Sequence, residues 1–329
     1  MHQLNIWKHW IQWERDDPLV LKQDDTDSYK ARVMFVYKHA LMAMRFWPEL
    51  WVDASEFCFA NGMDNEGNQF LTNGIAANPE SCLLAFKRAD RIELTTSSEE
   101  GDDKHLRRAA AIKEPYEKVL DALYDLITKS KSREELDLAR IEAQFASTST
   151  EPQVNGLNEE TKEEDDSDTL DEEAVKEKQK NDQIEATKSM HAVQLRLLSQ
   201  TLSGVWIALM RALRRIQGKG GVGIGGARGT FSDARKRGRI TPAVYVQAAL
   251  IEFHCYDPDT GKKIFDRGLK LFQEDEAFAL EYIRHLVAIN DHTSKHAFSL
   301  ARSAPLTFIQ MLVLYSKPSS PVSLKNQRL

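Results

Sequence analysis

The sequence predicts an all-α solenoid of paired helices, on two observations. Amphipathic stretches with apolar residues at helical spacing follow one another along the chain, and alternation typical of β-strands never exceeds a few residues. The aromatic residues that open three later helices also recur at similar distances: Trp206, Tyr245 and Phe278 lie 39 and 33 residues apart. Periods in the thirties built from two helices are typical of a solenoid, because a single pair cannot bury its own apolar face.

The first predicted hairpin ends at Pro48. In its first helix Trp7, Trp10 and Trp13 recur every third residue, and Glu14 follows directly. After a turn, the string ARVMFVYKHALMAMRFW carries a second apolar stripe at helical spacing. We interpret the tryptophans as core positions that a preceding repeat or a partner must cover, and base stacking with RNA is the alternative.

Two further hairpins follow in the same style. Residues 49–57 and 70–77 form the second, and its closing Pro79 lies 31 residues after Pro48. The third pairs a helix from residue 80 with one that contains residues 112–123, across the polar insertion TTSSEEGDDKH.

One segment does not fit the array. Residues 147–188 contain 14 Asp or Glu, 5 Lys or Arg and no aromatic residue, which gives a local charge of −9. Because the whole chain carries −6, the remainder carries about +3. We predict a disordered acidic insertion, either inert or an RNA mimic that competes for a basic face, with helix resuming near Met190.

The glycine-rich stretch GKGGVGIGGARGTF, which follows the predicted helix of Trp206, resembles a phosphate-binding loop only in part. Ile224 and Gly225 stand where a P-loop needs Lys and Ser or Thr, and a helix rather than a strand precedes the glycines. We interpret the stretch as a connector between two helices, the second being RGTFSDARKRG. A nucleotide-dependent enzyme is the hypothesis that we rank last.

Other catalytic or metal sites find no support in the sequence. Cys58, Cys82 and Cys255 form no C-x-x-C pair, and His292 and His296 lack both the Glu of H-E-x-x-H and a third ligand. We therefore expect no catalytic residue, no metal and no cofactor. The start of the chain is interrupted by charges and the longest apolar run is about twelve residues, so we expect a soluble, intracellular protein without a membrane span.

The residue types inside the hairpins are more specific than a generic helical repeat. First helices carry aromatic residues and end in an acid, whereas second helices carry Arg, an aliphatic residue, an aromatic residue and then Ala or Gly, as in IFDRGLKLF. This resembles the half-a-TPR (HAT) repeat. The residues that we assign to this motif are Trp7, Trp10, Trp13, Glu14, Arg32, Tyr37, Pro48, Trp51, Trp206, Tyr245, Phe265 and Arg267.

Longer strings such as LNIWKHWIQWERDDPLVL, NPESCLLAFKRADRIE and ARKRGRITPAVYVQAALIEFHCY resemble the fungal mRNA 3′-end-processing scaffold of the suppressor-of-forked family, the counterpart of the large HAT subunit of cleavage stimulation factor. The resemblance runs from about Leu4 to Asp291 without the acidic insertion, and corresponds to the C-terminal half of the family's HAT array. It implies a non-catalytic, homodimeric scaffold that holds an RRM-type RNA-binding subunit and other cleavage and polyadenylation factors. It also implies indirect RNA contact and a nuclear location, with the cytoplasm as a second one.

We accordingly divide the chain into residues 1–146 with about three HAT hairpins, 147–188 as the acidic insertion, 189–291 with two hairpins plus a first helix, and 292–329 as an aberrant or truncated tail. The tail lacks the Arg-aliphatic-aromatic helix that is due after Asp291. We favour a truncated or misread reading frame, since a solenoid is expected to end in a capping repeat. A family-specific tail is the alternative.

A basic cluster supports the second-ranked function, direct RNA binding. Its side chains would contact phosphates, form a nuclear import signal, or simply make up the solvated face of a repeat. The cluster consists of Arg211, Arg214, Arg215, Arg228, Arg235, Lys236, Arg237 and Arg239.

Overall fold

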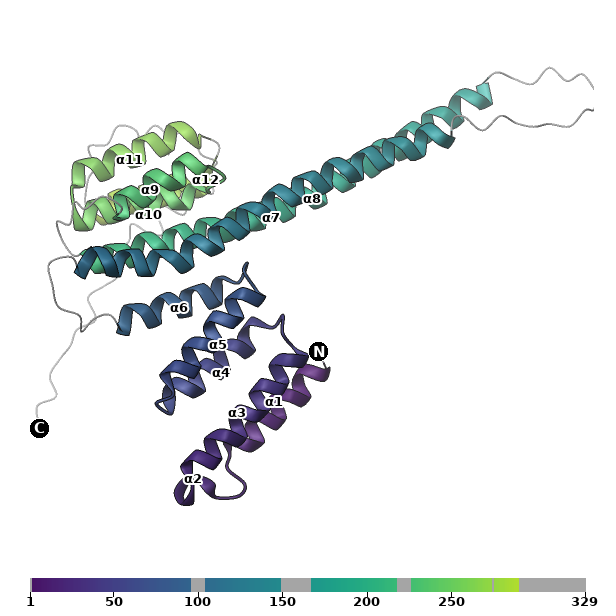
Figure 1. Ribbon diagram of the computed structural model, residues 1–329. Coiled ribbons are helices and arrows are strands. Elements are labelled where there is room, and N and C mark those ends of the chain that lie inside the picture. The colour runs from purple at the N-terminus through teal and green to yellow at the C-terminus, as the bar shows by residue number, and fades with distance from the viewer. Residues whose placement is uncertain (1, 96–103, 149–166, 218–225, 274, 290–329) are drawn as a thin grey trace, which may run out of the picture. The chain divides into compact units, whose positions relative to one another are not determined.

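The computed structural model describes residues 2–95, 104–148, 167–217, 226–273 and 275–289 (Figure 1). Within these ranges every regular element is a helix, so the predicted all-α helical-repeat class is confirmed. The helices are α1 (His2–Arg15), α2 (Leu21–Asp24), α3 (Thr26–Ala43), α4 (Pro48–Ala60), α5 (Asp64–Ala77), α6 (Cys82–Thr95), α7 (Lys104–Thr148), α8 (Ser167–Gln217), α9 (Ala227–Arg237), α10 (Pro242–Cys255), α11 (Pro258–Leu271) and α12 (Glu276–Ala288).

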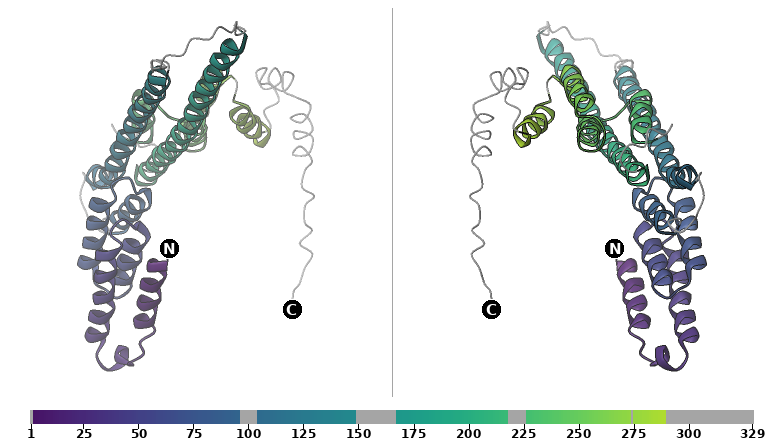
Figure 2. Two further views of the ribbon diagram at one scale, coloured as in Figure 1. Left: turned by 90° about the vertical axis from the view of Figure 1, so that its right-hand side faces the viewer. Right: turned by 90° about the vertical axis from the view of Figure 1, so that its left-hand side faces the viewer.

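The chain divides into two compact units, residues 1–239 and 240–329. In the first unit the packed hairpins are α1 with α3, α4 with α5, α6 with α7, and α8 with α9. Successive hairpins also contact each other, through α3 with α4, α5 with α6, and α7 with α8. Figure 2 shows the short α2 at the turn between the antiparallel α1 and α3. This nearest-neighbour packing is the arrangement expected of a solenoid.

Local sequence signals account for where these helices begin. Pro48 and Pro242 occupy the first turns of α4 and α10, where a missing N–H costs no helical hydrogen bond. At α3 and α12 the N-cap acids Asp25 and Asp275 accept from the backbone N–H groups of Ser28 and Phe278. The helices predicted in the first two hairpins lie within the observed ones, but the second helix of each hairpin begins earlier than predicted, at Thr26 and at Asp64.

The helices α7 and α8 are much longer than predicted, with 45 and 51 residues, and they pack against each other (Figure 1). Helix α8 begins at Ser167, about six turns before Met190, so residues 167–188 of the acidic insertion are helical. The physical reason is that this stretch is rich in Glu, Lys, Gln and Ala, which favour helix without any apolar periodicity. Residues 149–166 of the insertion lie outside the described residues.

The core of the first unit begins at the interface of the first two hairpins. Buried apolar side chains from α1, α3, α4 and α5 form one cluster there, which Leu84 of α6 joins. A second set of buried residues lies between α7 and α8, and includes Leu120, Leu123, Leu209 and Leu213. The lengthened helices therefore share a core only over part of their length.

The second unit consists of α10, α11 and α12, which all contact one another. Phe265 of α11 is stacked on Tyr282 of α12, with ring centroids 4.6 Å apart. Gly268 allows α11 to approach Phe278 of α12 closely, because a Cβ at this position would lie 2.2 Å from Phe278 Cζ. The third residue of the recurring aromatic series, Phe278, is thus buried where α11 approaches α12.

Several predictions fall outside the described residues. They concern the connector glycines at 218–225, most of the polar insertion after α6, His292 and His296, and the tail at 292–329. Among the described residues, no helix is long and apolar enough to cross a membrane.

Candidate functional site

An ion pair with a buried carboxylate joins the two helices of the first hairpin. Glu14 lies in the last turn of α1 and is only 6% exposed. Arg32 of α3 donates to it twice, from Nε to Oε2 at 3.0 Å and from Nη2 to Oε1 at 2.9 Å. A bidentate guanidinium–carboxylate pair fixes both distance and orientation. The acid and the arginine that we assigned to the repeat motif therefore contact each other directly.

A second polar network connects the first hairpin to the second. The Tyr37 hydroxyl donates to Asp53 Oδ2 of α4 at 2.7 Å. The Arg15 guanidinium donates both to this hydroxyl at 3.2 Å and to Asp53 Oδ1 at 3.0 Å. Burial, and then the hydrogen bond to Asp53, raise the pKa of Tyr37, so the hydroxyl keeps its proton and remains a donor. One side chain from each of α1, α3 and α4 thus sets the stacking of two repeats.

Trp51 lies between α4 and α5 and anchors the end of α3. Its indole Nε1 donates at 2.8 Å to the carbonyl of Arg45, which follows the C-cap of α3 and would otherwise lack this partner away from water. Gly74 of α5 allows the close approach, because a Cβ at that position would lie 2.9 Å from Trp51 Cβ. Trp51 therefore contributes to the packing of α4 against α5 and the end of α3.

The three tryptophans of α1 differ in burial and do not form a continuous buried stripe. Trp7 and Trp10 stack with ring centroids 5.5 Å apart, yet Trp10 is 39% and Trp13 is 48% exposed. Leu4 and Ile11 are the apolar residues of α1 that are buried. Trp10 and Trp13 thus lie on an uncovered face of this hairpin, which is the situation for which we expected a covering repeat or partner.

The remaining motif residues lie mainly in aromatic contacts. Trp206 is buried in α8, and its Nε1 donates to the Tyr124 hydroxyl of α7 at 3.4 Å. Tyr245 makes an edge contact with Phe272, with centroids 5.3 Å apart. Arg267, in contrast, is exposed on α11.

The basic cluster comes together from the end of α8 and from α9, and acids on other helices neutralise part of it. Arg215 donates to Glu93 of α6 from Nε at 3.0 Å and from Nη2 at 2.8 Å. The hydrogen bond from Arg215 lowers the pKa of Glu93, so this carboxyl is ionised at neutral pH. Because Glu93 supplies a compensating charge, the site offers less positive potential to phosphate than its sequence indicates.

The side chain of Arg237 is held by α7. Its Nη2 donates to Asp121 Oδ1 at 2.7 Å, and its guanidinium carbon lies 4.1 Å from the centroid of the Tyr124 ring. Lys236 lies 3.8 Å from Asp233 on the same helix, and the Arg235 guanidinium lies over Phe231 at 5.6 Å. Three of the eight predicted phosphate contacts, Arg215, Lys236 and Arg237, therefore have an acidic partner within the unit. Phosphate contact by any of the eight side chains remains a prediction.

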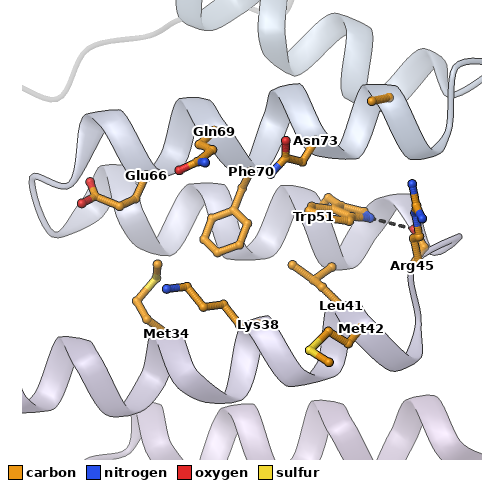
Figure 3. A pocket seen from close by; sticks show the side chains of 11 residues that line it. Met34, Lys38, Leu41, Met42, Arg45, Trp51, Glu66, Gln69, Phe70 and Asn73 are labelled. Atoms are coloured by element: carbon orange, nitrogen blue, oxygen red, sulfur yellow. Dashed lines mark hydrogen bonds between the residues drawn. The ribbon is translucent and has the colours of Figure 1, made fainter.

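A surface cavity of the first unit lies elsewhere, between α3 and α5 (Figure 3). Its volume of about 760 Å³ falls within the usual range for ligand-binding clefts, and Trp51 and Phe70 lie at its base. We call this cavity the α3–α5 groove. Sequence reasoning missed it, although one signal was present: α5 carries Gln69 and Asn73 four residues apart on one exposed face.

The described residues were also compared with the ligand sets of metal sites. No group of three or more His, Cys, Asp or Glu side chains is arranged there to hold a metal ion. Burial raises the pKa of Cys58 to about 11, so this thiol stays protonated at neutral pH.

Comparison with known proteins gives a consistent family. The family model described as Suppressor of forked protein (Suf) matches residues 1–301. The mRNA 3′-end-processing protein rna14 of Aspergillus oryzae is 57% identical over 290 residues, which cover 88% of this chain and 26% of that protein. The corresponding protein of Neurospora crassa is 44% identical over 334 residues, covering 97% of this chain and 27% of its own length.

More distant relatives are also found. The mRNA 3′-end-processing protein rna14 of Schizosaccharomyces pombe is 25% identical over 292 residues, which cover 88% of this chain and 32% of that protein. The chain therefore spans between a quarter and a third of the length of these relatives. The family resemblance inferred from the repeat motifs is confirmed.

Proposed function

Because the chain belongs to the suppressor of forked family, we propose that it acts in mRNA 3′-end processing, as a helical-repeat scaffold without catalytic residues. The observation that supports this proposal most strongly is the family match over residues 1–301, together with relatives that are named mRNA 3′-end-processing proteins. A solenoid suits such a role, because stacked hairpins offer long surfaces to several partners at once.

The scaffold works as a homodimer in this proposal. Two copies would hold two copies of each bound factor, and so raise the effective concentration of those factors at one transcript. The bound factors are an RRM-type RNA-binding subunit and other cleavage and polyadenylation factors, and RNA contact is mainly indirect. The protein would act in the nucleus, where pre-mRNA 3′ ends are made.

Direct RNA binding by the basic cluster is the second candidate. The ion pairs of Arg215 with Glu93 and of Arg237 with Asp121 weigh against it, because the carboxylates compensate positive charge that would otherwise attract phosphates. Titration of the chain with single-stranded RNA at several salt concentrations separates the two candidates. Tight binding with a steep salt dependence that Arg228→Glu abolishes would favour direct contact.

A reconstituted cleavage reaction tests the proposed function. A fungal nuclear extract depleted with antibodies against this chain should lose pre-mRNA 3′ cleavage, and the purified full-length protein should restore it. Splicing in the same extract serves as the control and should not change. Undiminished cleavage in a fully depleted extract would refute the proposal.

A further inference from the structure

The α3–α5 groove combines an apolar base with an uncovered apolar ridge. Met34, Leu41, Trp51 and Phe70 provide the apolar lining between the two helices (Figure 3). Met42 continues this surface toward solvent and is 78% exposed. An apolar cleft of this size with an exposed apolar edge is a favourable place to bury a large side chain from another molecule.

The charges around the groove are unevenly placed. Lys38 and Arg45 lie on the α3 side, and neither forms an ion pair within 4.0 Å in the part of the chain that the structure describes. Glu66 lies on the α5 side, at the opposite end of the groove from Arg45 (Figure 3). Acidic groups of a ligand would therefore be attracted to the α3 side of the groove, which carries both cations, and away from Glu66.

The amides of α5 give a further constraint on the ligand. Gln69 and Asn73 are exposed, and both line the groove. Residues four apart on a helix are displaced by about 6 Å along its axis. Two residues of an extended chain span about 6.6 Å, so the side-chain amides can pair with alternate peptide groups of a segment that runs along α5.

We propose that the α3–α5 groove docks an extended peptide segment of a partner protein, with one large apolar side chain packed against Trp51 and Phe70 and acidic residues beside Lys38 and Arg45. The apolar side chain supplies the buried anchor, the amides bind the peptide backbone, and the cations select the sequence. This is a docking surface on the first unit alone. It requires neither the dimer nor a role in 3′-end processing, so its test succeeds or fails independently of the proposed function.

A selection from random peptides tests the proposal before any natural partner is identified. Ten-residue random peptides displayed on phage are selected on this chain, and in parallel on the Ala76→Phe variant. Ala76 lines the groove and is exposed, so a phenylalanine there fills the groove without displacing core residues. We expect peptides that bind only the unmodified groove to share a large apolar residue flanked by Asp or Glu.

Affinity measurements with one selected peptide then test whether the charges of Lys38 and Arg45 contribute to binding. Fluorescence anisotropy should show binding about tenfold weaker for the double variant Lys38→Glu/Arg45→Glu. The matched control is Lys8→Glu/Lys129→Glu, which changes the net charge by the same amount at exposed lysines on α1 and α7 and should leave affinity nearly unchanged. Replacing Gln69 and Asn73 by Ala should also weaken binding, while thermal unfolding of each variant checks that it remains folded.

Three outcomes would overturn the proposal. One is the absence of peptides that distinguish the open from the filled groove. Another is equal loss of affinity in the two double variants, which would indicate non-specific attraction to net charge. The third is a lower oligomeric state of Ala76→Phe in light scattering, which would assign the groove to a second copy of this chain.

Discussion

At the scale of single residues, paired side chains between helices determine how each hairpin closes. The sequence identified Glu14 and Arg32 as motif residues, and the structure brings them into one bidentate pair. It did not identify Asp53, which completes the network with Arg15 and Tyr37. The sequence around Asp53 does not indicate this role, because its partners Arg15 and Tyr37 belong to the preceding hairpin and meet Asp53 only when the two hairpins stack.

Substitution of Arg32 tests the ion pair with the buried carboxylate of Glu14. Arg32→Ala leaves the carboxylate of Glu14 buried without its donors, so we expect a loss of about 2 kcal/mol in the free energy of unfolding. Lys118→Ala breaks a solvent-exposed ion pair with Glu114 on one helix and should cost about 0.5 kcal/mol or less. Urea denaturation measures both, and hydrogen exchange should localise the first effect to α1. Equal small losses would contradict this account of the pair.

The buried His285 makes the stability of the second unit dependent on pH. Burial, and then the nearby charges of His254 and Lys262, lower the pKa of His285 below its ordinary value of 6.5. The folded state therefore favours the neutral ring, which stacks on Phe265 with centroids 5.1 Å apart. As pH falls through 6.5 toward the lowered value, the unfolded state takes up a proton more readily and stability decreases.

Hydrogen exchange of α12 at pH 7.5 and at pH 5.5 would measure this effect. Protection should be lower at the acidic pH, and His285→Phe should reduce the difference. His39 on the exposed face of α3 provides the control, since His39→Phe should leave the difference in α12 as it is. A pH dependence that persists unchanged in His285→Phe would show that another group causes it.

At the scale of helices, the sequence predicted those elements that have an apolar stripe and a clear stop signal. The helices before Pro48 and before Pro79 end close to where the prolines indicated. The ends of α7 and α8 could not be predicted in this way, because their charged segments are helical without a buried face. A further contact there, His191 Nε2 with Asp137 Oδ2 at 3.1 Å, joins residues 54 positions apart.

Substitution of two helical glycines distinguishes the effect of close packing from the effect of backbone entropy. Gly268→Ala would place a Cβ against the Phe278 ring, so we expect a loss of about 1–3 kcal/mol in the second unit. Gly204→Ala lies in α8 with nothing within 4 Å of the new Cβ, and should stabilise its helix by about 0.5–1 kcal/mol. Thermal or urea unfolding of the two variants provides the comparison. Stabilisation by Gly268→Ala would mean that α11 and α12 are not so closely packed.

At the scale of the whole molecule, the difference between prediction and structure concerns contacts that are distant in sequence. The basic cluster was visible from composition, but its acidic partners Glu93 and Asp121 lie 122 and 116 residues away from Arg215 and Arg237. Only a three-dimensional arrangement reveals such pairs. The same is true of the α3–α5 groove, whose lining residues come from three helices that the sequence pattern treats separately.

The central claim, a dimeric scaffold, is tested most directly by light scattering on the purified chain over about a hundredfold range of concentration. The account predicts a molar mass that stays at twice 37.5 kDa throughout this range. A mass of 37.5 kDa at every concentration would contradict it, because this part of the protein would then not bring two copies of its partners together.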